Sequence, residues 1–479
     1  MLHTNDIHGW IMARPDRKAG GRMVGGAAAL ARVVKRERGK GGPMLLLDAG
    51  DWFQGTPEGT ITRGRSVADI FNALEYDAVT LGNHEYDYGE EPLKALIARL
   101  EVPVVGSNVH GVAGGGPVDY VKPYIVKEVA GVKVGIFGLL TTRMPVITIP
   151  KNVAGLRFPD EVETARRMVA ALREAGADVV VALSHIARGA AERGGSLSDR
   201  DLAERVSGID LIVGGHAHVP VFEPERDQRT GTLIVNTGWA LTRVGRAVLE
   251  IDPERKRVVS SKGELVDLWI DEVGEDPEIR KIVEKYQEEV GRRLEVVIAT
   301  ASVTLEHDRE KISSLGVWVT DCIRRWTKTQ IAFQNGGGIR ADLRAGPVRL
   351  RDIFEIMPFD NYVVTLYMSG AGVRSILEHG VSRAPGKVQV SGLRFKYDPD
   401  APAGRRLREV SVGGRPLADD EVYSVSAPDF LVLGGDDYEA FGEGTDKAVT
   451  GTLSRDALIW CAQENSPIEA RDAGRVLVH

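Results

Sequence analysis

In the first half of the chain, short apolar segments alternate with helical segments, and this alternation constrains the fold more than any other feature. Seven apolar segments are typical of strands: GPMLLLDAG, DAVTLG, VPVVGSN, VKVGIFGLL, ADVVVALSH, DLIVGG and GTLIVNTG. Segments such as GGAAALARVVKRERGK, SVADIFNALEY and EPLKALIARL lie between them and carry helical patterns. Such alternation indicates an α/β domain in which helices pack against central sheets. The pattern ends near residue 265, so we assign residues 1–268 to a first domain.

A long amphipathic segment, EDPEIRKIVEKYQEEVGRRL, follows this domain. Asp276 suits an N-cap and Pro277 suits the first helical position. The apolar residues that fall on one face at helical spacing are Ile279, Ile282, Val283, Tyr286 and Val290. We therefore predict a linker helix within residues 269–295 and a second domain over residues 296–479.

Length and composition limit the classes of protein to consider. A chain of 479 residues is long enough for two to four domains. Its 43% hydrophobic and 27% charged residues are ordinary for a soluble globular protein. A net charge of −7 argues against a partner nucleic acid, and no apolar run reaches the roughly 18 residues of a membrane span. We expect a small-molecule substrate as the partner, and composition leaves monomer and homodimer equally open.

The number of cysteines and the pattern of the first residues indicate the cellular compartment in which the protein is expected. Cys322 and Cys461 are too few for a disulfide framework or a thiolate metal site, and we expect Cys322 to be a buried helix residue. The opening MLHTNDIHGW has neither the basic nor the apolar region of a signal peptide. The sequence as written predicts a cytoplasmic protein, and a mature form with its leader removed stays open as the alternative.

Five segments in the first half carry metal-type ligands, and each follows an apolar strand: LHTNDIHG, LLLDAGDW, TLGNHEYD, VVALSHIARG and LIVGGHAHVP. Open α/β sheets bind ligands at the carboxyl ends of their strands, so these endings can converge on one point. In addition, Asp6 with His8 and His216 with His218 form i, i+2 pairs, which share one face of an extended backbone. A lone histidine after a strand is as well explained by packing or a turn, but five complementary segments favour a metal site.

The candidate ligands are Asp6, His8, Asp51, Asn83, His185, His216 and His218. Two metal ions about 3.5–4 Å apart require a shared carboxylate and several further donors. Asp51 is the candidate bridge, and the other residues supply imidazole and oxygen ligands. A mixed nitrogen and oxygen set without cysteine suits Mn, Zn, Fe, Co or Ni. We therefore predict a site for two divalent metal ions.

These motifs also carry a family resemblance. The order D-x-H, G-D, G-N-H-E, an isolated His and G-H-x-H resembles the calcineurin-like metallophosphoesterases. LHTNDIHG and GNHEYDYG, followed by NGGGIR and GGDDYEAF, narrow the resemblance to the 5'-nucleotidase family, which includes bacterial UDP-sugar hydrolases. The resemblance covers nearly the whole chain. It implies a four-layer αββα metallophosphatase domain, joined by a helix to a smaller α+β nucleotide-binding domain.

The resemblance also implies roles in the first domain. One metal ion would be held by Asp6, His8, Asp51 and His218, and the other by Asp51, Asn83, His185 and His216. Many family members have Gln where His218 stands, which affects the expected metal preference. His84 matches the catalytic histidine that faces the phosphoryl group, and Asp87 matches its carboxylate partner. We assign the remaining acid of this loop, Glu85, to loop structure.

In the second domain, the same resemblance implies a nucleotide site. Phe359 and Phe430 would sandwich the base. In proteins that bind single-stranded nucleic acids, such stacking accepts any of the bases. The other expected substrate contacts are Asn335 at the base edge, Asp436 at the ribose, Arg309 and Arg340 at phosphate, and Gly337 and Gly338 in a close-approach loop. Two positions depart from the family pattern, since Asp437 replaces a usual Gly and Val317 replaces a usual Asn.

The function that the resemblance implies is hydrolysis of nucleoside 5'-monophosphates to nucleoside and phosphate, with UDP-sugars or other nucleotides as further substrates. Mn, Zn and Co are the metals first expected. A 2',3'-cyclic-nucleotide 2'-phosphodiesterase/3'-nucleotidase is the alternative enzyme. An inactive nucleotide-binding protein would lack a ligand, and the expected set is complete here. Relatives are commonly periplasmic or extracellular after loss of a leader.

Overall fold

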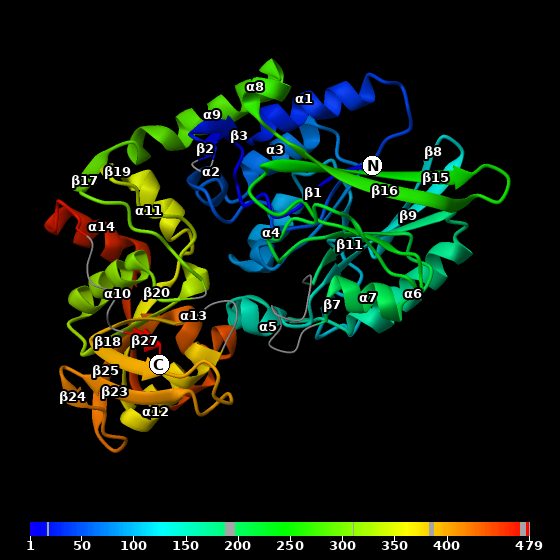
Figure 1. Cartoon of the computed structure of the whole chain (residues 1–479). Coiled ribbons are helices and arrows are strands. Elements are labelled where there is room, and N and C mark those ends of the chain that lie inside the picture. Colours follow the sequence, from blue (N-terminus) through cyan, green and yellow to red (C-terminus); the bar gives the residue numbers. More distant parts are fainter. Residues whose placement is uncertain (17–18, 187–196, 310, 383–387, 470–475, 479) are drawn as a thin grey trace. The chain divides into compact units, whose positions relative to one another are not determined.

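The computed structural model describes residues 1–16, 19–186, 197–309, 311–382, 388–469 and 476–478 (Figure 1). It divides into two compact units, Met1–Val290 and Gly291–His479, which are described separately below. Among the described residues, no helix combines the length and apolar character needed to cross a membrane.

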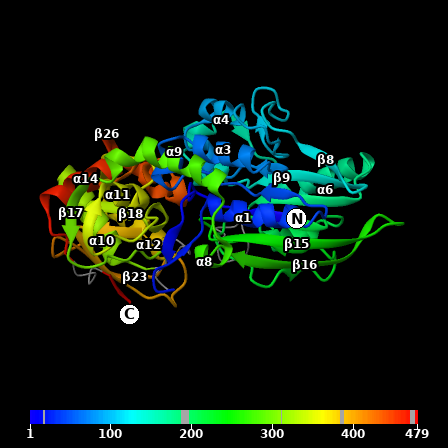
Figure 2. The ribbon, with the colours of Figure 1, turned by 90° about the horizontal axis from the view of Figure 1, so that it is seen from above.

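The first unit contains two six-stranded sheets. The first has the order β16-β15-β1-β4-β5-β6. Its strands are β1 (Leu2–Thr4), β4 (Leu46–Asp48), β5 (Ala78–Thr80), β6 (Val104–Val105), β15 (Arg243–Asp252) and β16 (Arg257–Asp267). β1, β4, β5 and β6 run parallel, whereas β15 pairs antiparallel with β1 and forms a long hairpin with β16 (Figure 2).

The second sheet has the order β13-β14-β12-β11-β9-β8. Its strands are β8 (Tyr124–Val129), β9 (Val132–Leu140), β11 (Val179–His185), β12 (Leu211–Gly214), β13 (Glu225–Arg226) and β14 (Leu233–Val235). The four inner strands are parallel, and the two edge strands are antiparallel to their neighbours. The carboxyl ends of the parallel strands therefore lie at one edge of each sheet.

Side-chain alternation explains how the sheets stack. Successive residues of a strand point to opposite faces. Val179, Val181 and Leu183 of β11 enter the core between the two sheets, whereas Val180 and Ala182 enter a separate core. That second core also includes residues of α6 (Glu161–Glu174) and α7 (Asp199–Arg205), while α1 (Ala27–Arg38) and α3 (Arg65–Ala73) cover the first sheet (Figure 1). The four-layer αββα prediction is confirmed.

Shorter elements complete the first unit. The remaining helices are α2 (Pro57–Thr60), α4 (Glu90–Ile97), α5 (Met144–Ile147) and α8 (Ile270–Val273), with 3-10 turns at His84–Tyr86 and Pro150–Asn152. Two small ribbons pair β2 (Arg14–Asp16) with β3 (Arg22–Val24), and β7 (His110–Gly111) with β10 (Leu156–Arg157).

Helix α9 (Pro277–Leu294) has the predicted start and the predicted apolar face. Asp276 Oδ1 accepts hydrogen bonds from the backbone N–H groups of Glu278 and Ile279, each at 3.1 Å. Ile279, Val283 and Tyr286 are buried in the core beneath α1 and α3. The Tyr286 hydroxyl also donates to Asp69 Oδ2 at 2.6 Å. Most of this helix therefore packs as part of the first unit.

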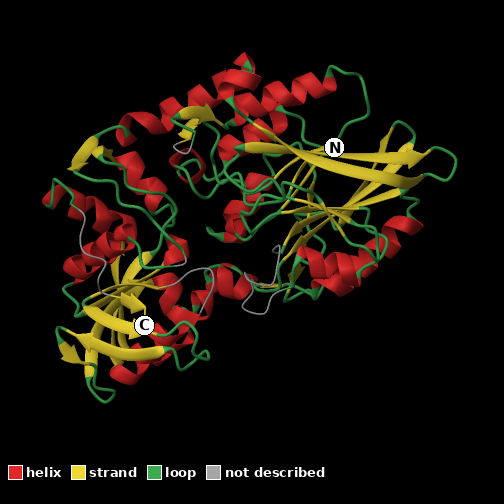
Figure 3. Ribbon diagram, viewed as in Figure 1, coloured by secondary structure: helices red, strands yellow, loops and turns green. Residues whose placement is uncertain are grey.

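The second unit is built on a five-stranded sheet flanked by helices (Figure 3). In sheet order its strands are β21 (Val388–Ser391), β18 (Ile331–Asn335), β25 (Val422–Pro428), β20 (Tyr362–Ser369) and β26 (Thr445–Leu453). Smaller sheets consist of β24 (Arg415–Pro416), β23 (Leu407–Val412), β22 (Leu393–Tyr397) and β27 (Val476–Val478), and of β17 (Val297–Ala301) and β19 (Gly346–Arg349). The helices are α10 (Ser314–Thr327), α11 (Leu350–Ile356), α12 (Gly370–Ser382), α13 (Asp429–Val432) and α14 (Ser454–Glu464), with 3-10 turns at Gly336–Gly338, Gly435–Asp437 and Glu439–Glu443.

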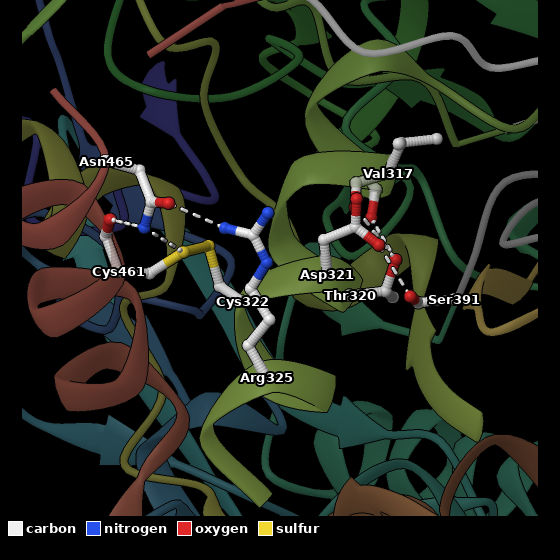
Figure 4. Close-up of a disulfide and its surroundings, with 9 residues drawn as sticks. Val317, Thr320, Asp321, Cys322, Arg325, Ser391, Cys461 and Asn465 are labelled. Carbon is white, nitrogen blue, oxygen red and sulfur yellow. Dashed lines mark hydrogen bonds between the residues drawn. A yellow bond between two sulfur atoms is a disulfide. The ribbon is translucent and has the colours of Figure 1, made fainter. Parts of the chain in front are cut away.

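A disulfide joins Cys322 and Cys461, although the sequence had offered too few cysteines to predict a disulfide framework (Figure 4). They are 139 residues apart in sequence, but α10 and α14 pack together and bring their Cα atoms to 5.5 Å. That distance is within the range a disulfide spans. Cys322 is a fully buried helix residue, as predicted. The number of cysteines could not reveal this pairing, because the packing of α10 on α14 is a tertiary contact.

Candidate active site

The predicted metal ligands lie at or just after the carboxyl ends of parallel strands. Asp6 and His8 follow β1, Asp51 follows β4, and Asn83 follows β5. In the second sheet, His185 is the last residue of β11, and His216 follows β12 with His218 two residues later. Both sheets thus supply ligands, because their parallel strands end on the same side of the unit.

The described structure brings these side chains into two overlapping groups. Ligand atoms of Asp6, His8, Asp51 and His218 all lie within 4.8 Å of one another, as do those of Asp51, His185 and His216. Asn83 joins the second group, since its Oδ1 lies 2.9 Å from His216 Nδ1. Asp51 is common to both groups, which is the position that a bridging carboxylate needs.

Two histidines of this cluster are oriented by backbone carbonyls. His8 Nδ1 donates to the Gln54 carbonyl and His185 Nδ1 donates to the Ala49 carbonyl, each at 2.7 Å. A carbonyl only accepts, so Nε2 of each ring keeps its lone pair for another partner. Metal-binding histidines are commonly held in this way. The contacts therefore fix the ring faces that a metal ion requires.

The environment of His185 shows that the cluster demands positive charge. Its Nε2 lies 3.1 Å from Asp51 Oδ2, so a neutral ring would place a lone pair against a carboxylate. Burial opposes a charge on His185, yet Asp51 and Asp6 outweigh it and raise the pKa of His185 to about 10. Either a proton or a metal ion would place positive charge between the two groups. The residues present therefore fit a cationic metal.

The two carboxylates of the cluster respond differently to burial. Burial raises the pKa of Asp6 to about 7, and the nearby charge of Asp51 adds to this effect. Burial alone would also raise the pKa of Asp51, but the imidazoles of His185, His84 and His8 outweigh it and hold that pKa well below its usual range. The surrounding imidazoles thus favour the charged form of Asp51.

Five of the seven predicted ligands have a left-handed backbone, namely Asp6, His8, Asp51, His216 and His218, with φ between 49° and 69°. Residues other than glycine adopt this region rarely, and each instance costs on the order of 1–3 kcal/mol. Such strain persists only where the surrounding contacts determine the conformation. At Asp51 and Asp6, the side chains of two further residues, Glu85 and Asn5, provide such contacts.

Glu85, assigned to loop structure from the sequence, holds the Asp51 loop. Its carboxylate accepts hydrogen bonds from the backbone N–H groups of Asp51 (2.9 Å), Trp52 (2.8 Å) and Gly82 (2.6 Å). It is 1% exposed, so these bonds are shielded from water. Glu85 therefore ties the segment after β4 to the segment after β5.

Asn5 performs the corresponding task for Asp6. Its Nδ2 donates to Asp6 Oδ2 at 2.7 Å and to the Gly238 carbonyl at 2.7 Å. Its Oδ1 accepts from the backbone N–H of Thr237 at 2.9 Å. Sequence reasoning missed Asn5, although its place directly before Asp6 in HTNDIH was a usable signal. The partners at residues 237 and 238 carried no such signal.

His84 and Asp87 form a hydrogen-bonded pair beside the cluster. His84 Nδ1 donates to Asp87 Oδ2 at 2.7 Å, and the backbone N–H of His84 donates to Asp51 Oδ1 at 2.9 Å. Asn152 Nδ2 donates to the Asp87 carbonyl at 2.7 Å, which holds this turn. The His84 side chain is 14% exposed, so a ligand at the cluster can reach it. The geometry suits a histidine that contacts a substrate.

In the second unit, the structure brings together some of the predicted nucleotide-site residues. Asn335 Nδ2 donates to Asp436 Oδ2 at 2.9 Å. Arg340 Nη1 donates to the Gly337 carbonyl at 3.3 Å, and its guanidinium carbon lies 5.7 Å from the Phe359 ring centroid. Asn335 with Asp436 and Arg340 with Phe359 thus form two local pairs.

The glycines and the remaining residues of this site show different constraints. A Cβ at Gly338 would lie 2.4 Å from Gln334 Nε2, so glycine suits that position, whereas a Cβ at Gly337 would make only an ordinary contact at 3.8 Å. The Phe430 ring packs over Gly435, where an added Cβ would lie 2.6 Å away. Arg309 is half-buried in the segment between β17 and α10. Its phosphate contact and the pairing of Phe359 with Phe430 stay predictions.

The structure shows the backbone conformation or the burial of the two residues that depart from the family pattern, Asp437 and Val317. Asp437 has a left-handed backbone with φ of 60°, which explains why glycine suits this position. Asp436 before it is also left-handed. Val317 is fully buried in the first turn of α10, where it presents an apolar side chain.

Comparison with known proteins agrees with this geometry. Residues 1–220 match the family described as calcineurin-like phosphoesterase, and residues 293–443 match the 5'-nucleotidase C-terminal domain. The chain is 28% identical to the snake venom 5'-nucleotidase of Crotalus adamanteus, over 95% of this chain and 84% of that protein. It is 28% identical to the human 5'-nucleotidase, over 92% of this chain and 83% of that protein. The crystal structure of a 5'-nucleotidase precursor from Thermus thermophilus is 31% identical, has a TM-score of 0.91, and aligns over 100% of this chain and 98% of that one.

Proposed function

Because the chain belongs to the 5'-nucleotidase family and is a phosphoester hydrolase, we propose that it hydrolyses nucleoside 5'-monophosphates at a centre of two divalent metal ions. The observation that carries this proposal is the pair of ligand groups that share Asp51, with the His84–Asp87 pair beside them. Mn, Zn and Co are the metals that we propose to test first, since the donors are imidazole and oxygen.

We propose a separate role for each group of residues in the cluster. Asp6, His8, Asp51 and His218 would hold one ion, and Asp51, Asn83, His185 and His216 the other. When bound, such a pair of ions lowers the pKa of a water and neutralises charge on the phosphoryl oxygens. Asp87 fixes His84 with Nδ1 protonated, which leaves the opposite edge of the ring for a phosphoryl oxygen. His84 would stabilise charge there as the displacement proceeds.

The second unit would select the nucleotide. We propose that Phe359 and Phe430 hold the base, that Asn335 and Asp436 contact base and ribose, and that Arg309 and Arg340 bind phosphate. Arginine suits phosphate because its planar fork donates two parallel hydrogen bonds. UDP-sugars and 2',3'-cyclic nucleotides remain in the proposal as further substrates, and a relative named as a trifunctional nucleotide phosphoesterase from Bacillus subtilis supports such breadth.

A substrate panel tests the proposal directly. Protein stripped with a chelator is reloaded with Mn, Zn or Co and assayed for phosphate release. We expect AMP to be hydrolysed by the reloaded protein and not by the stripped protein. Rapid release from 2',3'-cyclic AMP with none from AMP would replace the 5'-nucleotidase assignment by the cyclic-nucleotide alternative.

The double variant Phe359→Ala/Phe430→Ala separates a nucleotidase from a general phosphatase. Stacking on an aromatic ring contributes about 1–3 kcal/mol per base, so we expect KM for AMP to rise by roughly 10-fold or more. Hydrolysis of p-nitrophenyl phosphate should change much less, because that substrate has no base to stack. An unchanged KM for AMP would show that the base is held elsewhere.

A further inference from the structure

A stack of aromatic rings stands behind His218. The Trp239 and His218 ring centroids are 5.4 Å apart, and the two rings are within 9° of parallel. Trp10 meets Trp239 edge-on, with centroids 6.3 Å apart. The Arg14 guanidinium carbon lies 3.8 Å from the Trp10 centroid and 5.4 Å from that of Trp239. The Trp239 ring therefore lies parallel to a predicted metal ligand, and Trp10 and Arg14 from a distant segment pack against that ring.

The backbone around Trp239 is tied to the metal-ligand loop. On one side, the Gly238 carbonyl accepts from Asn5 Nδ2 at 2.7 Å. On the other side, the Ala240 N–H donates to the Asp6 carbonyl at 2.8 Å. Ala240 itself is left-handed, with φ of 60°, so the chain adopts a rare conformation at this point. The indole is thereby held in a fixed place relative to Asp6.

His218 is the member of its group that most needs support. Its side chain is 11% exposed, whereas those of Asp6, His8 and Asp51 are at most 2% exposed. Its Nε2 lies 2.8 Å from His8 Nε2 and 3.4 Å from Asp6 Oδ1, where a small ring rotation would remove it from the group. A flat ring that lies parallel to the imidazole limits such a rotation.

We propose that Trp239, supported by Trp10 and Arg14, is a positioning residue that fixes the imidazole of His218 as a metal ligand. This inference rests on the proposed two-metal centre and adds a determinant of metal affinity to it. Trp239 touches neither substrate nor metal in this assignment and acts only through His218. Removing a residue that orients a metal ligand typically weakens metal binding by about 10- to 100-fold.

Metal titration of the stripped protein tests the proposal without relying on turnover. Stripped wild-type protein, Trp239→Ala and Trp239→Phe are titrated with Co²⁺ or Zn²⁺ against a chromophoric chelator. We expect two ions in the wild type, and a loss of about 10-fold or more in the affinity for one of them in Trp239→Ala. Trp239→Phe should recover most of that loss, because phenylalanine keeps a flat face.

Trp269→Ala is the matched control. Trp269 is also a half-buried tryptophan of the first unit and carries an arginine, Arg22, whose guanidinium carbon lies 4.5 Å from its ring centroid. The Trp269→Ala protein should bind both metal ions with wild-type affinity. An equal loss in Trp269→Ala and Trp239→Ala would make the effect a general consequence of losing a tryptophan and would overturn the proposal.

A double-mutant cycle separates positioning from folding. In the background His218→Gln, the further change Trp239→Phe or Trp239→Ala should alter metal affinity little, because the ring that Trp239 supports is gone. Wild-type affinity in a folded Trp239→Ala protein, or equal effects in both backgrounds, would overturn the inference. Fewer than two ions in the wild type would instead contradict the two-metal centre, so the two failures are distinguishable.

Discussion

The metal-ligand loops of the first unit and the nucleotide-site loops of the second are built under different constraints. Five of the seven predicted metal ligands have a left-handed backbone, whereas among the eight predicted nucleotide-site residues only Asp436 does. The ligand loops are also joined by buried hydrogen bonds, of which those of Glu85 and Asn5 are the centre. The residues of the second site form separate pairs, such as Asn335 with Asp436, whose hydrogen bond is only part-buried.

This difference indicates where the molecule tolerates change. Left-handed residues other than glycine cost on the order of 1–3 kcal/mol each, so the ligand loops keep their shape only while every supporting contact is present. Metal coordination needs ligand atoms that are fixed within fractions of an ångström. Loops with a strained backbone that are hydrogen-bonded to one another hold their ligand atoms in this way. Recognition of a base by stacking is more permissive. We therefore expect substitutions in the first region to abolish activity and those in the second to tune substrate affinity.

The largest effect should come from Asp51→Asn. Asp51 is common to both ligand groups, and the amide keeps its size while removing its charge. We expect loss of at least one metal ion and of nearly all turnover, measured by metal analysis of the purified protein and by phosphate release from AMP. Full metal occupancy with a near-normal rate would contradict the two-metal assignment and would remove the contrast between the two regions.

His84→Asn should lower kcat while leaving the metals bound. His84 is not a predicted metal ligand. Its Nδ1 donates to Asp87, its backbone N–H donates to Asp51, and its ring meets that of His8 edge-on with centroids 5.4 Å apart. Removing one group that stabilises transition-state charge costs about 100- to 1,000-fold in kcat. Metal analysis is the control. If the variant instead lost metal, His84 would have to be counted among the ligands.

Reduction of the Cys322–Cys461 disulfide should weaken the second unit and spare the first. A disulfide of this kind contributes typically 2–4 kcal/mol to the free energy of unfolding, more for long loops. This one closes a separation of 139 residues and ties α10 to α14. We expect denaturant unfolding of the second unit to move to lower concentration with a thiol reductant, with unchanged metal affinity in the first unit. Superimposable unfolding curves with and without reductant would contradict this prediction.

The sequence predicted features that depend on neighbouring residues better than contacts between distant segments. The layers of the first unit and the ligands at its strand ends are written in local patterns, such as the alternation in VVVALSH and the pair in GGHAH. The disulfide and the Trp239–His218 stack were missed because each joins segments whose proximity only the folded chain establishes. Glu85 lies between these cases. Its role in the loop was predicted, but its three backbone donors come partly from the segment after β4.

The smallest effect, and the finest test of the nucleotide region, should come from Asp437. This residue combines a negative charge with a left-handed backbone, so two variants are needed to separate these properties. Asp437→Asn removes the charge, and asparagine tolerates the left-handed region nearly as well as aspartate. Asp437→Gly removes the charge and also relieves the backbone. Asp437 is half-buried, so solvent still screens part of its charge. Taking the range of a solvent-accessible charge pair, about 0.2–1 kcal/mol, we expect both variants to lower KM for the AMP dianion by at most about 5-fold. The gain in affinity should shrink as salt is added, because salt screens charges that are not buried.

If only the glycine variant changed KM, the backbone freedom of residue 437 and not its charge would control the affinity for AMP. If KM stayed constant in both variants at low salt, Asp437 would not face the nucleotide, and its charge would play no part in the substrate affinity of the second region.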